Sequence, residues 1–302
     1  MAKQTNDRPK GKQAAQPGRS SRKARQAEAE RRRQRTRRAG LAGVGLVLAF
    51  VAFVVVGSLF RPKPSSQPST SAGSAGTAVQ QVPAATLNAV GAGSGVTPPM
   101  ALAANTPPLT QGEKPQVLYV GAEYCPYCAA ERWPLIVALS RFGTFDNLGA
   151  TSSSATDVFP NTQTFSFHGS TYTSHSIAFD GVETQTNTGQ ALDQPTAAQQ
   201  ALFQQFDAAP YTNQPGAIPF LMIGNRYVSI GAEYDPGILQ GMTRDQIVAA
   251  LADPTSPVAK TVDGAANTIT AAICQTTGGK PASVCSSPTI TQVASTLPAP
   301  TS

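Results

Sequence analysis

The chain has 302 residues, with 26 glycines, 25 prolines and a charged fraction of 13%, so a large part of it is expected outside any packed core. The net charge of +6 is local: residues 1–40 carry 14 of the 23 Lys and Arg and 3 of the 17 acids, which gives +11 there and −5 elsewhere. A mildly acidic main body argues against a nucleic-acid-binding fold, and no nucleic-acid partner is expected.

The first predicted element is a membrane-spanning helix at residues 41–60, which begin with Leu41, end with Phe60 and carry no charge. A helix of this length rises about 30 Å, enough to cross the hydrocarbon core. A buried core helix is the alternative, but such helices keep a polar stripe. Residues 31–38 contain six arginines. The positive-inside rule therefore predicts a single-pass cell-membrane protein with a disordered cytoplasmic tail at 1–40 and an extracytoplasmic remainder.

The same segment has two other interpretations. Arg37 and Arg38 before an apolar run weakly resemble a twin-arginine export signal, but no Ala-x-Ala cleavage site follows directly, so an uncleaved anchor is preferred. The basic tail could also touch anionic lipid or nucleic acid, and a disordered topogenic tail is the simpler interpretation.

Residues 61–114 are predicted to be a linker, because Pro, Ser, Thr, Ala and Gly dominate them and charge is almost absent. A flexible chain of about 50 residues reaches roughly 40 Å, which would hold a domain clear of the bilayer. The stretch 84–90 is the part that could pack on that domain. Residues 286–302, rich in Ser, Thr and Pro, are predicted to be a disordered tail.

The predicted folded domain at 115–285 opens with a short apolar run at 116–121, typical of a buried strand. The pattern then indicates a helix at 129–142, with Trp133 in the core and a kink at Pro134. Residues 145–194 are polar and locally alternating, which favours strands and loops.

The second half of the domain has clearer helix and turn signals. A helix is expected at 195–208, and two strands at 218–223 and 226–230 flank Gly224-Asn225, the turn chemistry of a tight hairpin. Thr243 and Gln246 form a capping box for a helix through residue 251. A last helix is expected at 258–274.

Cys125 and Cys128 are the candidate catalytic residues. Where a strand ends and a helix begins, Cys125 meets unpaired backbone donors and the helix dipole, which favour a thiolate. Cys128, one turn inward, can then attack a mixed disulfide formed at Cys125. The alternatives are a structural disulfide, which would constrain little chain across two intervening residues, and a zinc site. His168 and His175 come with no second Cys-x-x-Cys, so no metal is expected.

The second cysteine pair has a different character. Cys274 and Cys285 have ten residues between them, follow the last predicted helix and have no motif around them. A structural disulfide is predicted, and a bond closing this loop would contribute about 3 kcal/mol.

The sequence resembles the thioredoxin-like superfamily. Ala122-Glu123-Tyr124-Cys125 is similar to the run before the thioredoxin dithiol, Pro126-Tyr127 is the dipeptide of many glutaredoxins, and an exported setting suits proteins of the Dsb type. Ile218-Pro219 looks like the family's cis-proline loop, which lies against the dithiol and offers backbone to substrate. The layout over residues 116–251 also resembles a bacterial family of membrane-anchored thioredoxin-like proteins of unknown function. The resemblance implies an α/β thioredoxin-like fold, with Pro219, Ile218, Tyr127 and Pro126 binding substrate.

Two departures separate this chain from that family. Tyr119 stands where thioredoxins carry a buried acid, and Glu123 or Glu131, the possible substitutes, are expected to be solvated surface charges. Residues 145–194 form an enlarged insert without the helical pattern of the Dsb-type insert. Trp133, Tyr124, Tyr127 and Phe220 could line a substrate groove, with Trp133 favoured as core.

Two functions follow as hypotheses. The first is a thiol–disulfide oxidoreductase that acts on the thiols and disulfides of exported proteins through Cys125 and Cys128, needs no cofactor and is reset by a redox partner. The second is a non-catalytic thioredoxin-like envelope binding or assembly protein, whose disulfide is structural or senses redox state.

Overall fold

The computed structural model describes residues 72–300, all within one structural unit, Pro62–Ser302. The predicted cytoplasmic tail, the predicted membrane span at 41–60 and the start of the predicted linker lie outside the described residues. Along residues 72–300, none of the helices combines the length and the apolar character needed to cross a membrane. The membrane-spanning helix therefore stays a prediction.

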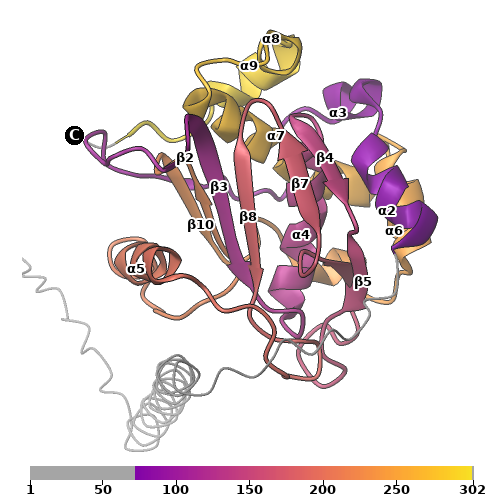
Figure 1. Ribbon diagram of the computed structural model, residues 1–302. Helices are drawn as coiled ribbons and strands as arrows, with labels where there is room; N and C mark the ends of the chain where they lie inside the picture. Colours follow the sequence, from indigo (N-terminus) through magenta and orange to yellow (C-terminus); the bar gives the residue numbers. More distant parts are fainter. Residues whose placement is uncertain (1–71, 301–302) are drawn as a thin grey trace, which may run out of the picture. The chain divides into compact units, whose positions relative to one another are not determined.

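A six-stranded mixed β-sheet forms the centre of the fold (Figure 1). Its hub is β3 (Lys114–Gly121), which pairs parallel with β8 (Ala178–Glu183) and antiparallel with β9 (Phe220–Ile223). The last six residues of β3 are buried, as the apolar run predicted. The predicted α/β class is confirmed at this level.

The sheet continues beyond β9. β9 forms a hairpin with β10 (Tyr227–Ile230), and β10 pairs with the short strand β1 (Met100–Ala101). Gly224 and Asn225 both have positive φ, which is the conformation of the predicted tight turn. The two-residue strand β2 (Thr110–Gln111) pairs with the start of β3.

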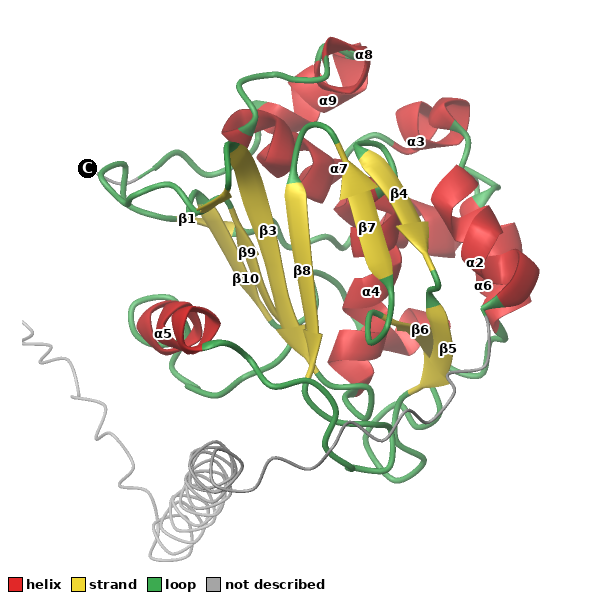
Figure 2. Ribbon diagram, in the orientation of Figure 1, coloured by secondary structure: helices red, strands yellow, loops and turns green. Residues whose placement is uncertain are grey.

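Helices cover both faces of the sheet (Figure 2). On one face lie α4 (Pro126–Leu139), which follows β3 directly, and α7 (Pro257–Thr276), which packs against it. The opposite face carries α5 (Ala197–Phe206), whose Phe203 ring meets the Phe220 ring edge-on at 5.2 Å between centroids. Almost all of α4 is buried, so it is a central helix with no solvent-facing side.

α4 continues through Pro134, which lacks the N–H that would bond the carbonyl of Ala130. The Tyr234 hydroxyl donates to that carbonyl instead, at 2.7 Å. A side chain from a distant part of the chain thus satisfies the acceptor that the proline leaves open.

The remaining helices follow their predicted signals. Both α5 and α6 (Arg244–Leu251) begin with a capping box, at Thr196 and Thr243, and α7 spans the predicted last helix. A short 3-10 helix, η2 (Pro236–Leu239), precedes α6.

The predicted linker is wrong for residues 72–114. They form α2 (Gly73–Ala78), the 3-10 helix η1 (Val79–Gln81) and α3 (Ala84–Val90), followed by β1 and β2. Val79 is fully buried and Leu87 is 3% exposed. Small residues make the composition resemble a linker, yet they also allow close packing: a Cβ at Gly93 would lie 2.0 Å from the Lys260 carbonyl oxygen.

The predicted disordered tail is wrong for most of 286–300. After α8 (Ala282–Cys285) the chain forms α9 (Pro288–Ala294), which buries Ile290 and Val293. The predicted disulfide between Cys274 and Cys285 is present, with a Cα–Cα distance of 5.5 Å, and joins the end of α7 to this segment.

The segment predicted as an insert is only partly one. It contains β4 (Gly143–Asp146), β5 (Gly149–Ser152), β6 (Gln163–Ser166) and β7 (Thr171–Ser174), which pair as β4 with β7 and β5 with β6. The strands that the alternating pattern predicted are confirmed. Its last strand, β8, however, belongs to the central sheet as the parallel neighbour of β3.

Candidate active site

The two candidate cysteines lie where β3 ends and α4 begins. Cys125 is the N-cap of α4, and its sulfur accepts a hydrogen bond from the backbone N–H of Cys128 at 3.3 Å. Pro126 follows at the first helical position, where its missing N–H costs nothing. Both cysteines are free thiols; Cys125 is 6% exposed and Cys128 is fully buried. Only Cys125 can therefore meet an external sulfur first.

The loop before β9 lies against this pair. The Ile218–Pro219 peptide is cis, as predicted, and the Cys125 thiol donates to the Ile218 carbonyl at 3.6 Å. The carbonyl of Pro219 accepts from the Gly231 N–H at 2.8 Å, which ties the loop to the end of β10. The structure thus brings together Cys125, Cys128, Ile218 and Pro219 from segments about 90 residues apart.

The surroundings shift the pKa values of the two thiols in opposite directions. Hydrogen bonds from the Cys128 thiol and from backbone amides, with help from the charge of Arg132, lower the pKa of Cys125 despite its burial. Burial, together with the neighbouring Cys125, raises the pKa of Cys128 well above its ordinary value. This difference suits an attacking thiolate and a resolving thiol.

Beneath the dithiol is a buried ion pair that the sequence analysis missed. Arg132 donates from Nε and Nη2 to the two carboxylate oxygens of Glu183 at 2.7 and 2.6 Å, and both side chains have no solvent exposure. The guanidinium carbon lies 5.7 Å from the ring centroid of Tyr119, which is also fully buried. The position of the expected acid is therefore occupied by a phenol beside an ion pair. A charge one turn after Cys128 in an apolar helix was the available signal for Arg132.

The expectation that Glu131 is a solvated charge is wrong. It is fully buried, and its Oε2 accepts from the backbone N–H of Glu233 at 3.0 Å. Ser229 donates to Glu233 Oε1 at 2.7 Å. Burial, and secondarily Glu233, raises the pKa of Glu131 well above its usual range, and burial raises the pKa of Glu233 to about 8. Glu123 is half-buried and accepts from Thr151.

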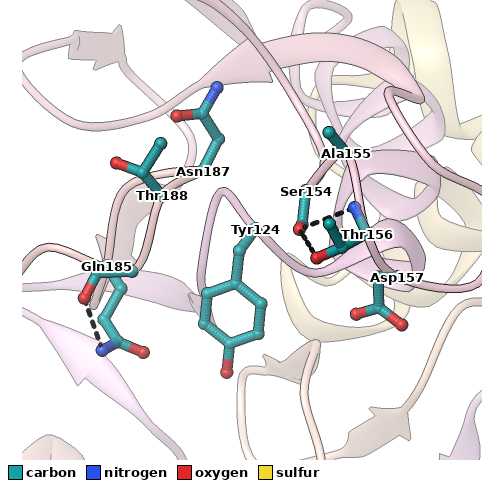
Figure 3. Close-up of a pocket in the computed structure, with 9 residues that line it drawn as sticks. Tyr124, Ser154, Ala155, Thr156, Asp157, Gln185, Asn187 and Thr188 are labelled. Carbon is teal, nitrogen blue, oxygen red and sulfur yellow. Dashed lines mark hydrogen bonds between the residues drawn. The ribbon is translucent and has the colours of Figure 1, made fainter.

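A groove of about 650 Å³ opens beside Tyr124, the residue before Cys125 (Figure 3). One wall is the loop after β5, including Ser154 and Asp157, and the other is the loop after β8, including Gln185 and Thr188. Both walls are bonded to the dithiol segment: Ser154 N–H donates to the Tyr124 carbonyl at 2.8 Å, and Glu123 N–H donates to the Gln185 carbonyl at 2.9 Å. The groove is thus fixed relative to the dithiol.

The aromatic residues suggested for a substrate groove divide into two groups. Tyr124 lines the groove, and Tyr127 is 41% exposed with its ring edge-on to Phe159. Trp133 and Phe220 are fully buried, so Trp133 is core as favoured and Phe220 is excluded from the groove.

Within residues 72–300, no cluster of three or more His, Cys, Asp or Glu side chains is placed to hold a metal ion. His168, one of the two histidines considered for zinc, instead contacts Asp193 at 2.7 Å.

A family model described as a domain of unknown function (DUF929) matches residues 101–275. The match covers more than half of the chain and includes the dithiol, the buried ion pair and the Pro219 loop. Neither a curated protein nor a solved structure matches the sequence.

Proposed function

We propose that this chain, which belongs to the DUF929 family, is a membrane-anchored, extracytoplasmic thiol–disulfide oxidoreductase built on a thioredoxin-like domain. The observation that carries the proposal is the placement of Cys125 as N-cap of α4. Its sulfur is hydrogen-bonded to the Cys128 N–H and to the Ile218 carbonyl beside Pro219. The order of β3, dithiol, α4 and a cis-proline before β9 supports the thioredoxin-like assignment.

In the proposed reaction Cys125 is the sulfur exchanged with substrate, and Cys128 resolves the mixed disulfide. Ile218 and Pro219 offer backbone to the substrate polypeptide, while Pro126 and the exposed ring of Tyr127 form the rim around the sulfur. The substrates are thiols or disulfides of exported proteins, and a redox partner resets the pair.

The proposed location rests on the apolar segment 41–60 and on the arginines before it. The Cys274–Cys285 disulfide supports the same side of the membrane, because such bonds persist in oxidising compartments.

The test is disulfide exchange with a cysteine-containing peptide, measured with the detergent-solubilised full chain. We expect exchange by the Cys274→Ser/Cys285→Ser variant, which keeps only the Cys125 and Cys128 pair, and none above background when Cys125→Ser is added. A rate that is the same with and without Cys125 would refute the proposal.

The second candidate, a non-catalytic envelope binding protein, is favoured by the low exposure of Cys125, which is 6%. It predicts that the pair neither reduces readily in glutathione buffers nor exchanges with peptide. The same experiment therefore separates the two functions.

A further inference from the structure

Two buried hydrogen-bond donors near the dithiol have no acceptor. Among the described residues, the Tyr119 hydroxyl and the Nη1 atom of Arg132 lack a hydrogen-bond partner, although both side chains are fully buried. An unsatisfied buried donor destabilises the folded state. The Nη1 side of the Arg132 guanidinium and the Tyr119 hydroxyl are therefore not engaged by a protein acceptor.

The fold places both donors behind Cys128. Arg132 follows Cys128 by four residues in α4, so the two side chains share one face of the helix, one turn apart. The Tyr119 hydroxyl lies over Gly121, where an added Cβ would be 2.3 Å from its oxygen. Gly121 is in register with Glu183 on β8, which brings phenol and ion pair together.

The charges around the dithiol are unequal. The ionisable groups that face the two sulfurs are Tyr119 from β3, Tyr124 from the motif loop and Arg132 from α4. Both phenols stay neutral near pH 7, because burial raises the pKa of Tyr124 to about 12 and raises that of Tyr119 well above its usual value. In the part of the chain that the structure describes, Arg132 is thus the cation acting on both sulfurs. Glu183 accepts hydrogen bonds only from Nε and Nη2 of Arg132.

We infer that Arg132, fixed by Glu183 and accompanied by the Tyr119 hydroxyl, is a buried counter-charge for the Cys125 thiolate of the reduced pair, so that Cys125 and Cys128 act as an oxidant of substrate thiols. A charge that stabilises the reduced form makes the disulfide more oxidising. This inference rests on the proposed function and gives it a direction.

The oxidation balances without a further reagent. A substrate thiolate attacks Cys125, the bond between Cys125 and Cys128 breaks, and Cys128 leaves as a thiolate opposite Arg132. A second substrate thiolate attacks the substrate sulfur of the mixed disulfide, and Cys125 leaves as a thiolate. The substrate dithiol loses two electrons and two protons and forms a disulfide, and the enzyme becomes a dithiol.

The test uses the full chain in detergent and needs no protein substrate. Two quantities are measured: the equilibrium constant for exchange with glutathione, and the pH midpoint for alkylation of Cys125. The variant Arg132→Met/Glu183→Gln removes both charges together, so no lone buried charge remains. Glu131→Gln is the matched control, because it alters the neighbouring residue of α4, which contacts Glu233 instead.

In the parent we expect a midpoint below about 8.5, the value of an unperturbed cysteine. In the double variant the exchange equilibrium should shift at least tenfold toward the disulfide, equivalent to about 30 mV, and the midpoint should rise by about one pH unit. Glu131→Gln should change neither quantity. If the double variant does not fold, Tyr119→Phe decides, with an expected shift of about threefold in the same direction, as for loss of one donor.

A folded double variant with an unchanged equilibrium and midpoint would overturn the inference, as would a parent midpoint at or above about 8.5. If the double variant does not fold, an unchanged exchange equilibrium in the Tyr119→Phe variant would overturn the inference. Failure of the proposed function has a different signature: peptide exchange is absent, while the charge effect on the alkylation midpoint remains measurable.

Discussion

The two sides of helix α4 differ in how they bury charge. Glu131 and Arg132 are adjacent in sequence and fully buried, but Arg132 meets an opposite charge in Glu183, whereas Glu131 meets another acid in Glu233. The side with the Arg132–Glu183 pair, called here the balanced side, lies behind the dithiol, and both residues keep their charges. On the other side burial raises the pKa of both carboxyls, and Glu233 adds to the rise at Glu131, so at least one of them holds a proton. Buried charge in this domain is thus stabilised by pairing on one side and avoided by protonation on the other.

The largest expected effect comes from breaking the balanced side. Arg132→Leu leaves the Glu183 carboxylate buried without a counter-ion, which should lower the free energy of unfolding by about 3–5 kcal/mol. Urea denaturation followed by circular dichroism measures it. Glu131→Gln is the comparison, because it replaces a carboxyl of the acid pair with a neutral amide and should not destabilise the protein at pH 8. Equal losses in the two variants would mean that the two sides do not differ.

The acid side should give stability a pH dependence. Glu233, with its pKa raised to about 8, holds a proton in the folded state that the unfolded chain releases near pH 4.3. The contribution of Glu233 to the free energy of unfolding is therefore complete below about pH 4.3 and is lost as pH rises toward 8. Asp263, whose pKa burial also raises to about 8, acts in the same direction.

Glu233→Gln should flatten this dependence by up to about 1.4 kcal/mol per pH unit between pH 5 and pH 8. Denaturant unfolding at pH 5, 6.5 and 8 measures the slope for parent and variant, with Glu123→Gln as an acid-to-amide control outside the pair. A parent protein that gains stability from pH 5 to pH 8 contradicts the description of Glu131 and Glu233 as a protonated pair.

A smaller effect concerns the Ala130 carbonyl, which accepts from Tyr234 because Pro134 has no N–H. Tyr234→Phe should cost about 1–2 kcal/mol of unfolding free energy. In a Pro134→Ala background the restored N–H can bond this carbonyl, so the same substitution should cost less than about 0.5 kcal/mol. A cost that is identical in the two backgrounds would show that the hydroxyl does not compensate for the proline.

Local patterns predicted much of the fold. The apolar run of β3, the Gly224-Asn225 turn and the capping box at Thr243 depend on neighbours in sequence, and all three are present in the structure. The cis bond before Pro219 was also predicted, through a family resemblance carried by short motifs.

What was missed depends on contacts between distant segments. Glu131 was expected on a surface and Arg132 was not singled out, but α7, β6, η1 and η2 pack around α4 and bury both residues. Glu183 follows Arg132 by 51 residues, so their pairing could not be read from spacing. Residues 72–83 were taken for a linker because their small residues bury little area each, and they pack on α4 and α6, which are distant in sequence. The packing considered for 84–90 is present, as α3 contacts α7.

The position of β8 has a consequence for protein engineering. A minimal domain made by deleting residues 145–194 would lose the parallel neighbour of β3, the carboxylate that holds Arg132 and both walls of the groove at Tyr124. Only the β4–β7 and β5–β6 pairs could be shortened without removing β8. The loop after β5 is itself hydrogen-bonded to the Tyr124 carbonyl. The segment is therefore an integral part of the redox module rather than a detachable accessory.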